Sequence, residues 1–218
     1  MFTGIIAEIG KVRAVSAGSG LWRIGITSNH VAQGAKKGDS IAVNGACLTV
    51  VHMLPQGFEA EIMPESWRRT TFYTLKPGDG VQLERALQAS GHFDGHQVLG
   101  DVDGVGKIRA VKPDGKALVV QIEPENQDML EFIVEKGRVA IDGASLTVVS
   151  TDSFSFSVAL IPFTQNMLLL GKKHLGAVVN LETDVAMKVT VAALRREEAK
   201  VDARKPQVTL ESLRKAGF

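Results

Sequence analysis

The chain has 218 residues, of which 44% are hydrophobic and 22% charged, and its net charge is +1. This balance is typical of a globular protein and gives no electrostatic reason to expect a nucleic-acid partner. The start, MFTGIIAEIG, lacks the basic segment of a signal peptide, and no stretch approaches the roughly 18 apolar residues that span a bilayer. Because Cys47 is the single cysteine, no intrachain disulfide forms, and a cytoplasmic location is expected.

The chain carries an internal repeat. GIIAEIGKVRAV at 4–15 returns as GDVDGVGKIRAV at 100–111, and NGACLTVV at 44–51 returns as DGASLTVV at 142–149. A third pair of segments, 58–87 and 156–185, keeps six residues in step: Phe58/Phe156, Pro64/Pro162, Gly78/Gly176, Val81/Val179, Leu83/Leu181 and Glu84/Glu182. The order and spacing predict two copies of one domain. We expect them at 1–95 and 96–184, followed by a C-terminal segment at 185–218.

The predicted elements are mostly strands. Apolar runs are short and rich in Val, Ile and Thr, and turn residues interrupt them every roughly 8–12 residues, which is typical of an all-β sandwich or barrel. Asn44-Gly45 and Asp142-Gly143 lie at matching points and predict either type I′ hairpin turns or tight corners.

Four segments favour short helices. They are 28–39, 64–72, 126–137 and 162–171, and the second and fourth match each other in the two copies.

The repeat stops near residue 185. VAMKVTVAALRREEAK at 185–200 follows Asp184, a plausible N-cap, and predicts an amphipathic helix that packs on a partner subunit. PQVTLESLRKAGF at 206–218 predicts either a second short helix capped by Thr209 or a solvated tail.

Common nucleotide and hydrolase motifs are absent, including GxGxxG, GxxxxGK[ST], CxxC and GxSxG. The densest polar cluster is GHFDGHQVLGDVDG at 91–104. If this segment is extended, His92, Asp94 and His96 share one face and suit zinc or iron. Its flanking glycines favour a turning connector instead, so both interpretations stay open.

Cys47 and Ser145 occupy equivalent positions, each followed by Leu-Thr-Val-Val. Thr49 and Thr147, two residues later, should face the same side of each strand. For Cys47 alone, inert packing is the alternative. Together the two pairs predict the floor of a pocket for a polar heterocycle in each copy.

The order of these blocks carries a family resemblance. They are MFTGII, GDSIAVNGACLTV, RRTTF, LKPGD, LERAL, DGHQVLGDVDG, KGRVAIDGASLTV, LIPFT and VNLETD. With them, the chain from Met1 to about Asp184 resembles riboflavin synthase of the duplicated-barrel type. The resemblance implies an all-β fold of two tandem six-stranded Greek-key barrels and a C-terminal helix that helps build a homotrimer.

The resemblance also implies a reaction. Two molecules of 6,7-dimethyl-8-ribityllumazine exchange a four-carbon unit, giving riboflavin and 5-amino-6-ribitylamino-uracil, with no metal or redox cofactor. Each barrel binds one lumazine, and an active site forms where the N-barrel of one subunit meets the C-barrel of a neighbour. Holding two rings together supplies roughly 7–11 kcal/mol of a barrier, and proton transfer supplies the rest.

The family pattern implies contacts in both barrels. In the N-barrel it implies Gly4, Ile5, Ile6, Cys47, Leu48, Thr49, Glu61, Ile62, Met63, Pro64, Glu65 and Ser66. In the C-barrel it implies Gly100, Asp101, Val102, Lys136, Ser145, Leu146, Thr147, Leu160, Ile161, Pro162, Phe163, Thr164 and Gln165. The residues matched to catalysis are Phe2, Ser40, Cys47, His96, Lys136, Ser145, Thr147 and Asp184.

These matches carry expected roles. Ser145 and Thr147 hold or activate the nucleophile at the acceptor ring, and His96 shuttles a proton. Lys136 stabilises negative charge on a ring oxygen or a ribityl group, and Cys47 lines the donor pocket.

The chain departs from the family pattern most clearly at Asp101, where the family has histidine. An aspartate there would work as a base or bond the pyrimidine edge. Phe163, Met167 and the Ser66-Trp67 pair are further departures.

Two other functions remain open at this point. The first is that of the related lumazine and yellow fluorescent proteins, which bind lumazine or flavin without catalysis. The second is an OB-like nucleic-acid module, which the near-neutral charge and 6% aromatic content disfavour.

Overall fold

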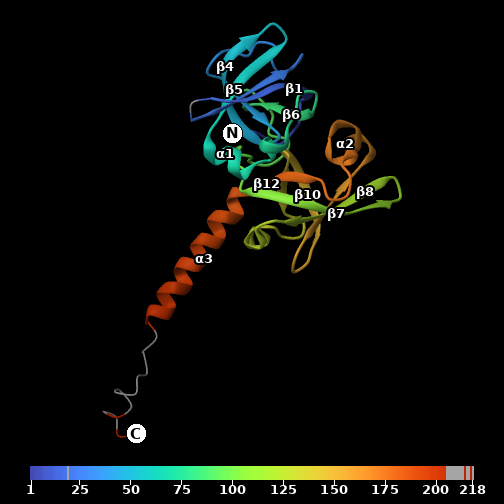
Figure 1. The fold of residues 1–218 in the computed structure, drawn as a ribbon. Coiled ribbons are helices and arrows are strands. Elements are labelled where there is room, and N and C mark those ends of the chain that lie inside the picture. The colour runs from blue at the N-terminus through green and yellow to red at the C-terminus, as the bar shows by residue number, and fades with distance from the viewer. Residues whose placement is uncertain (19, 205–213, 215–216, 218) are drawn as a thin grey trace.

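The computed structural model describes residues 1–18, 20–204, 214 and 217. Within this part the chain forms two closed six-stranded antiparallel β-barrels followed by one long helix (Figure 1). This confirms the all-β prediction and the two tandem barrels.

The first barrel is closed in the order β1-β2-β5-β4-β3-β6. Its strands are β1 (Glu8–Ala17), β2 (Trp22–Thr27), β3 (Ser40–Val43), β4 (Ala46–Leu54), β5 (Gly57–Ile62) and β6 (Gly80–Arg85). The second barrel is closed in the order β10-β11-β8-β7-β12-β9. Its strands are β7 (Gly104–Asp114), β8 (Ala117–Pro124), β9 (Arg138–Ile141), β10 (Ala144–Thr151), β11 (Phe156–Leu160) and β12 (Val178–Thr183).

Alternating burial explains why β4 and β10 each present one polar face. Leu48 and Val50 of β4 point into the core of the first barrel, while Cys47 and Thr49 between them face outward. The same alternation in β10 leaves Ser145 and Thr147 on the outer face. The predicted pair of small polar groups on one face is therefore present in both barrels.

The hairpins β3–β4 and β9–β10 turn at the predicted dipeptides. Asn44 and Gly45 have φ values of 45° and 84°, and Asp142 and Gly143 have 46° and 84°. A type I′ turn requires positive φ at both central residues. The two dipeptides therefore form hairpin turns, and the alternative of tight corners is wrong. The two turns abut: a Cβ on Gly45 would lie 2.7 Å from the backbone nitrogen of Gly143.

Three of the four predicted short helices are present in shortened form. The matching segments give α1 (Pro64–Arg69) and α2 (Pro162–Met167), followed by 3-10 turns at Thr71–Thr74 and Leu170–Lys172. Segment 126–137 gives a 3-10 helix at Gln127–Phe132.

The predicted helix at 28–39 is wrong, because this segment forms only turns. The carboxylate of Glu8 accepts the backbone N–H groups of Asn29, His30 and Val31. Gly34 and Gly38 then adopt φ values of 69° and 93°, which a right-handed helix does not accommodate. The chain is therefore held as a loop on the end of the first barrel.

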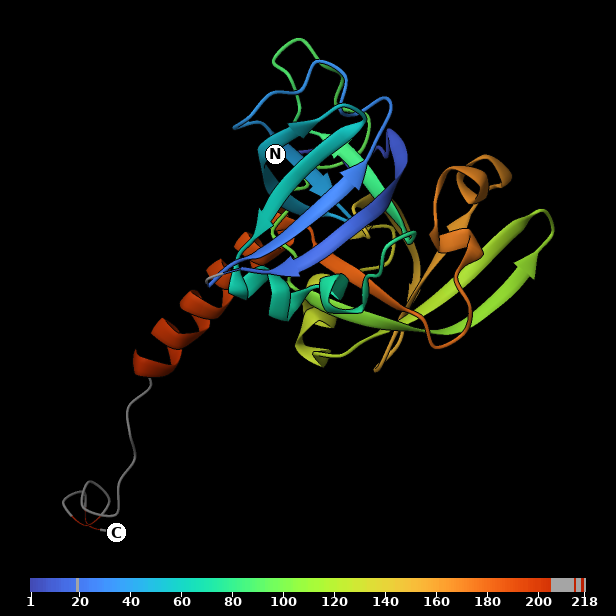
Figure 2. The same cartoon turned by 45° about the horizontal axis from the view of Figure 1, so that its top comes forward.

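The helix α3 (Val185–Arg204) begins directly after β12 and projects away from both barrels (Figures 1 and 2). Asp184 caps it, since its Oδ1 accepts the N–H of Ala186 at 2.9 Å, as predicted. Among the described residues no helix is long and apolar enough to cross a membrane. The second helix predicted around Thr209 lies outside the described residues.

Candidate functional site

Two short segments cross between the barrels and define the site. The N-terminal segment, residues 2–6, lies against β10 of the second barrel, where the carbonyl of Gly4 accepts the N–H of Ser145 at 2.8 Å. The connecting segment, residues 98–102, lies against β4 of the first barrel, where the carbonyl of Gly100 accepts the N–H of Cys47 at 2.9 Å.

The two crossing segments pair with each other midway. Phe2 and Val98 form an antiparallel bridge, with backbone N–O distances of 2.6 and 3.2 Å. The prediction that Gly4 lies in the N-barrel pocket and Gly100 in the C-barrel pocket is therefore wrong. Each segment pairs through its backbone with the other barrel, while it also stays bonded to its own barrel through Glu84 or Glu182. Phe2 itself is fully buried between the barrels.

A buried glutamate from each barrel anchors one crossing segment. Glu84 of β6 accepts the N–H groups of Thr3 and Gly4 at 2.7 and 3.0 Å. Glu182 of β12 accepts those of Leu99 and Gly100 at 2.6 and 3.0 Å. Burial raises the pKa of both carboxyls, that of Glu182 to about 7, against the opposing effect of these backbone donors.

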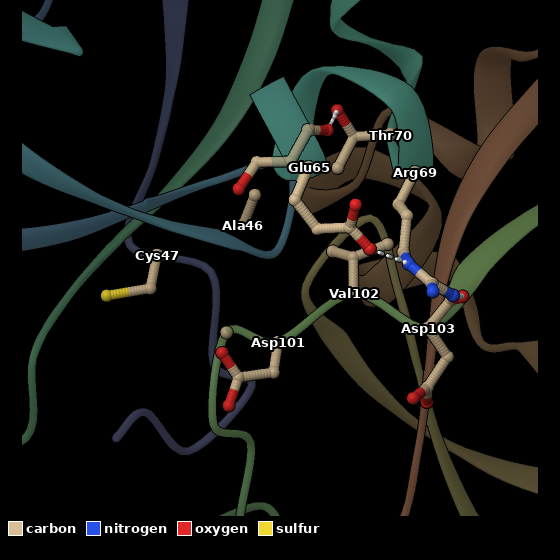
Figure 3. Close-up of a pocket in the computed structure, with 10 residues that line it drawn as sticks. Ala46, Cys47, Glu65, Arg69, Thr70, Asp101, Val102 and Asp103 are labelled. Atoms are coloured by element: carbon tan, nitrogen blue, oxygen red, sulfur yellow. Dashed lines mark hydrogen bonds and ion pairs between the residues drawn. The ribbon is translucent and has the colours of Figure 1, made fainter. Parts of the chain in front are cut away.

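The first barrel carries a cavity of about 290 Å³ on its outer face (Figure 3). β4, α1 and the connecting segment line it, through Ala46, Cys47, Glu65, Ser66, Arg69, Thr70, Gly100, Asp101, Val102 and Asp103. Asp101 therefore lies in the same cavity as Cys47, although the sequence analysis assigned the two to different barrels. We call this cavity the N-site.

An ion pair forms one wall of the N-site. Nε of Arg69 lies 2.6 Å from Oε1 of Glu65, and Arg69 also donates to the backbone carbonyl of Asp103 at 3.1 Å. Hydrogen bonding to Arg69 lowers the pKa of Glu65, so this carboxylate is ionised at neutral pH. Arg69 thus ties α1 to the connecting segment across the cavity (Figure 3).

The second barrel carries the matching outer face around Ser145, which we call the C-site. Oγ of Ser145 lies 2.6 Å from Nδ1 of His96, a buried residue two positions before the connecting segment. Burial lowers the pKa of His96, with Asp184 acting in the opposite direction and Arg138 in the same one, so the ring is neutral at pH 7. Its Nε2 is buried and has no hydrogen-bond partner among the described residues.

Lys136 lies just before β9, the strand that pairs with β10 of the C-site, in a conformation that lysine rarely adopts. Its φ is 63°, and the equivalent residue of the first barrel is Gly38, with φ 93°. Both backbone N–H groups make the same contact, from Lys136 to Val148 and from Gly38 to Val50, each at 2.9 Å. A non-glycine residue here costs about 1–3 kcal/mol, and such strained residues cluster at functional sites.

The remaining predicted residues divide by burial. Ile6, Leu48, Ile62, Leu146 and Leu160 point into the barrel cores, so only their backbone atoms can face a ligand.

The other residues lie on the outer faces. Those exposed are Ile5, Thr49, Met63, Glu65, Asp101, Thr147, Ile161, Pro162 and Phe163, and those partly exposed are Ser40, Glu61, Pro64, Ser66, Val102, Thr164, Gln165 and Asp184. Ser40 pairs with Thr49 across β3 and β4.

The alternating His92, Asp94 and His96 do not share one face. His92 and Asp94 are exposed, whereas His96 is buried against Ser145. Within the described residues there is no group of three or more His, Cys, Asp or Glu side chains that could hold a metal ion. The segment is a connector that positions one histidine.

Three functional residues were missed by sequence reasoning. Arg69 gave no signal, because a surface arginine on a short helix is ordinary. Glu84 and Glu182 did give one, since they keep step in the repeat, and a paired acid at the end of an apolar strand marks a buried anchor.

The comparisons with known proteins agree with this geometry. The lumazine binding domain model matches the chain twice, at residues 3–86 and 99–184. The riboflavin synthase of Actinobacillus pleuropneumoniae is 40% identical over 218 residues, which is 100% of both chains. The chain belongs to the riboflavin synthase family.

Other members of the riboflavin synthase family and its structural relatives match nearly as broadly. The riboflavin synthase of Schizosaccharomyces pombe is 40% identical over 87% of this chain and 92% of its own. The crystal structure of LumP complexed with 6,7-dimethyl-8-(1'-D-ribityl) lumazine has a TM-score of 0.75 and 26% identity, covering 84% of this chain and 99% of LumP.

Proposed function

We propose that the chain is a working riboflavin synthase. It transfers a four-carbon unit between two molecules of 6,7-dimethyl-8-ribityllumazine, giving riboflavin and 5-amino-6-ribitylamino-uracil. The observation that carries this proposal is the 2.6 Å contact between the Ser145 hydroxyl and His96 at the C-site. At the equivalent position the N-site has the thiol of Cys47 instead, so the two sites differ in chemistry. A dismutation of identical substrates needs two related sites of unlike chemistry, and the duplicated barrels supply them.

The C-site residues suit proton transfer. A neutral His96 accepts the proton of the Ser145 hydroxyl in one tautomer, or donates to its oxygen in the other. In the first tautomer Ser145 is the better nucleophile or base toward a bound ring, and His96 carries the proton away. Thr147 faces the same side two residues later, and Lys136 supplies positive charge for a ring oxygen or ribityl hydroxyl.

The N-site suits the second lumazine. Cys47 forms part of its floor, and Asp101 brings a carboxylate where the family pattern has histidine. As an exposed carboxylate, Asp101 acts as a base or accepts a hydrogen bond from the pyrimidine edge.

The proposal includes a homotrimer in the cytoplasm, with each active site formed between the N-site of one subunit and the C-site of the next. Support comes from α3, which projects from the barrels and leaves Val189, Leu194 and Val201 exposed by 64%, 59% and 56%. Exposed apolar residues along a projecting helix fit a subunit contact. The free Cys47 fits a reducing compartment.

The test is to mix the purified protein with 6,7-dimethyl-8-ribityllumazine and follow riboflavin by its absorbance and fluorescence. We expect turnover in the wild type and a loss of about 100-fold or more in Ser145→Ala, with lumazine binding retained. Ser150→Ala is the matched control, because Ser150 also lies on β10 and makes a 2.6 Å hydroxyl contact, with Ser157. Equal turnover in both variants contradicts the role of Ser145.

A second candidate function is binding of lumazine or riboflavin without turnover. The crystal structures of LumP in complex with 6,7-dimethyl-8-(1'-D-ribityl) lumazine and with riboflavin favour it. Saturable lumazine binding without any riboflavin formation by the wild type would establish this alternative.

A further inference from the structure

The helix α1 forms one wall of the N-site but has little to hold it in place. It contributes Glu65, Ser66 and Arg69 to the cavity. It has six residues, none of them fully buried, and no side chain caps its N-terminus. A helix of this length has almost no stability of its own, so its position depends on contacts with the barrel.

Arg69 holds the end of α1 to the backbone of Asp103, and one aromatic pair joins the helix to the strands of the first barrel. The rings of Trp67 on α1 and Trp22 on β2 are parallel to within 1°, with centroids 3.7 Å apart. Both side chains are half-buried and pack on the core of the first barrel. Trp22 pairs through its backbone with Ile62, two residues before α1 begins, so the strand that carries one ring of the stack lies beside the strand that leads into the helix.

The second barrel holds the equivalent helix by different chemistry. Gln165 of α2 stands where α1 has Trp67, and Leu118 pairs with Leu160 where Trp22 pairs with Ile62. The Nε2 atom of Gln165 donates to the backbone carbonyls of Leu160 and Lys116, at 2.8 and 3.1 Å. α2 is therefore fastened by hydrogen bonds to the barrel backbone, and α1 by a stack of two side chains.

We propose that Trp22 and Trp67 are positioning residues for the N-site, and that they set its affinity independently of the C-site. The inference rests on the proposed function in that the ligand is a lumazine or flavin. The stack fixes the angle of α1, and this angle fixes where Ser66 and the Glu65–Arg69 pair meet the ligand. The C-site does not depend on it, because α2 has its own fastening.

The Trp22–Trp67 stack can itself be followed by spectroscopy. These are the only two tryptophans of the chain, so the whole tryptophan signal comes from one side of one barrel. Two indoles in contact couple electronically and, where their transition moments are rotated relative to each other within the parallel planes, give a paired circular-dichroism band that a single indole lacks. That band reports the stack directly, whether or not the protein turns over substrate.

The experiment compares Trp67→Leu, Trp67→Phe and Trp22→Leu with the wild type, and uses Gln165→Leu as the matched control on α2. Riboflavin is titrated into each full-length protein by calorimetry, and the paired dichroism band is recorded. We expect Trp67→Leu and Trp22→Leu to lose the band and to weaken one of two riboflavin sites by about tenfold, a loss of about 1.4 kcal/mol, while the other site is unchanged. Trp67→Phe keeps an aromatic contact and should stay within about threefold of the wild type.

The outcomes separate the inference from the proposed function. If the wild type binds no riboflavin or lumazine, the proposed function fails. If it binds both and the leucine variants lose the band without any change in affinity, the positioning role is overturned. Trp22→Leu leaves α1 untouched, so it decides the matter if Trp67→Leu does not fold. If Gln165→Leu weakens the same site as Trp67→Leu, the claimed independence of the two sites is wrong.

Discussion

Ser145 and His96 meet at 2.6 Å although they belong to different parts of the chain, a strand of the second barrel and the segment that leaves the first. The histidine is buried, its Nε2 has no partner among the described residues, and burial lowers its pKa. A neutral imidazole therefore faces the serine hydroxyl under physiological conditions, which is the state that proton shuttling requires.

The acid limb of the turnover profile should lie below pH 6.5. Since the pKa of His96 in the folded protein is below its usual 6.5, the ring stays neutral to lower pH than an exposed histidine would. We expect His96→Gln, which keeps a polar contact with Ser145, to lose this limb and to cut turnover by about 100-fold. Turnover is measured against pH for both proteins, and an unchanged acid limb in the variant would refute the assignment.

His96 also makes stability depend on pH. Because its folded pKa is depressed, the unfolded chain takes up a proton first as the pH falls through about 6.5. The contribution of His96 to the free energy of unfolding therefore falls as the pH is lowered below about 6.5. His92→Gln changes an exposed histidine of the same segment and is the control for His96→Gln. The control should keep the wild-type loss of unfolding free energy toward acid pH.

Glu182 should make the protein less stable as the pH rises. Burial raises its pKa from 4.5 to about 7, so the folded state keeps a proton that the unfolded state releases between these values. The unfolding free energy falls across that window, by roughly 3 kcal/mol for this one group. Urea unfolding at several pH values should show a smaller fall in Glu182→Gln than in the wild type. Glu125→Gln, at an exposed glutamate, is the control, and parallel curves for all three proteins would contradict the prediction.

The pair of buried Asp142 and partly exposed Lys173 replaces an uncharged pair of the first barrel. Oδ2 of Asp142 is buried, lacks a hydrogen bond within the described part of the chain and faces Nζ of Lys173 at 3.4 Å. Asn44 and Leu75 hold the equivalent positions. Burial raises the pKa of Asp142, and Lys173→Leu removes the cation that opposes this, so we expect the carboxyl to take up a proton and a loss of about 1–3 kcal/mol in unfolding free energy.

The double variant Asp142→Asn/Lys173→Leu copies the first barrel and should recover stability to within about 1 kcal/mol of the wild type. Thermal and urea unfolding measure the coupling. Additive losses in the double variant would show that the two residues do not act as a pair.

Charges on α3 should dissociate the proposed homotrimer. Val189 and Leu194 are exposed in the single chain, and burying a glutamate at either position in a subunit contact is costly. We expect Val189→Glu/Leu194→Glu to reduce the mass from that of a trimer and to abolish turnover while lumazine binding persists. Native mass spectrometry and light scattering give the mass, and Glu198→Lys is the control. A trimer that survives both charges places the subunit contact elsewhere.

The internal repeat predicted two copies of one domain, and the strand rhythm predicted an all-β sandwich or barrel; the two six-stranded barrels were implied by the family resemblance. Alternation at Cys47–Thr49 and Ser145–Thr147 put small polar groups on one face, because side chains of a strand point to opposite sides in turn. Asn44-Gly45 and Asp142-Gly143 marked the hairpins, because both central residues of a type I′ turn need positive φ. These are local rules, and the structure confirms them.

Which residues share a site was decided only by the tertiary structure. Gly4 lies on Ser145 and Gly100 on Cys47, so each crossing segment completes the pocket of the other barrel. Asp101 thereby faces Cys47, and Arg69 closes the same cavity. Sequence order placed each segment with its own repeat, where Glu84 and Glu182 do anchor it, but the strand-edge hydrogen bonds of Gly4 and Gly100 cross to the other copy. The residue pattern within one copy does not indicate which copy supplies the partner of these hydrogen bonds.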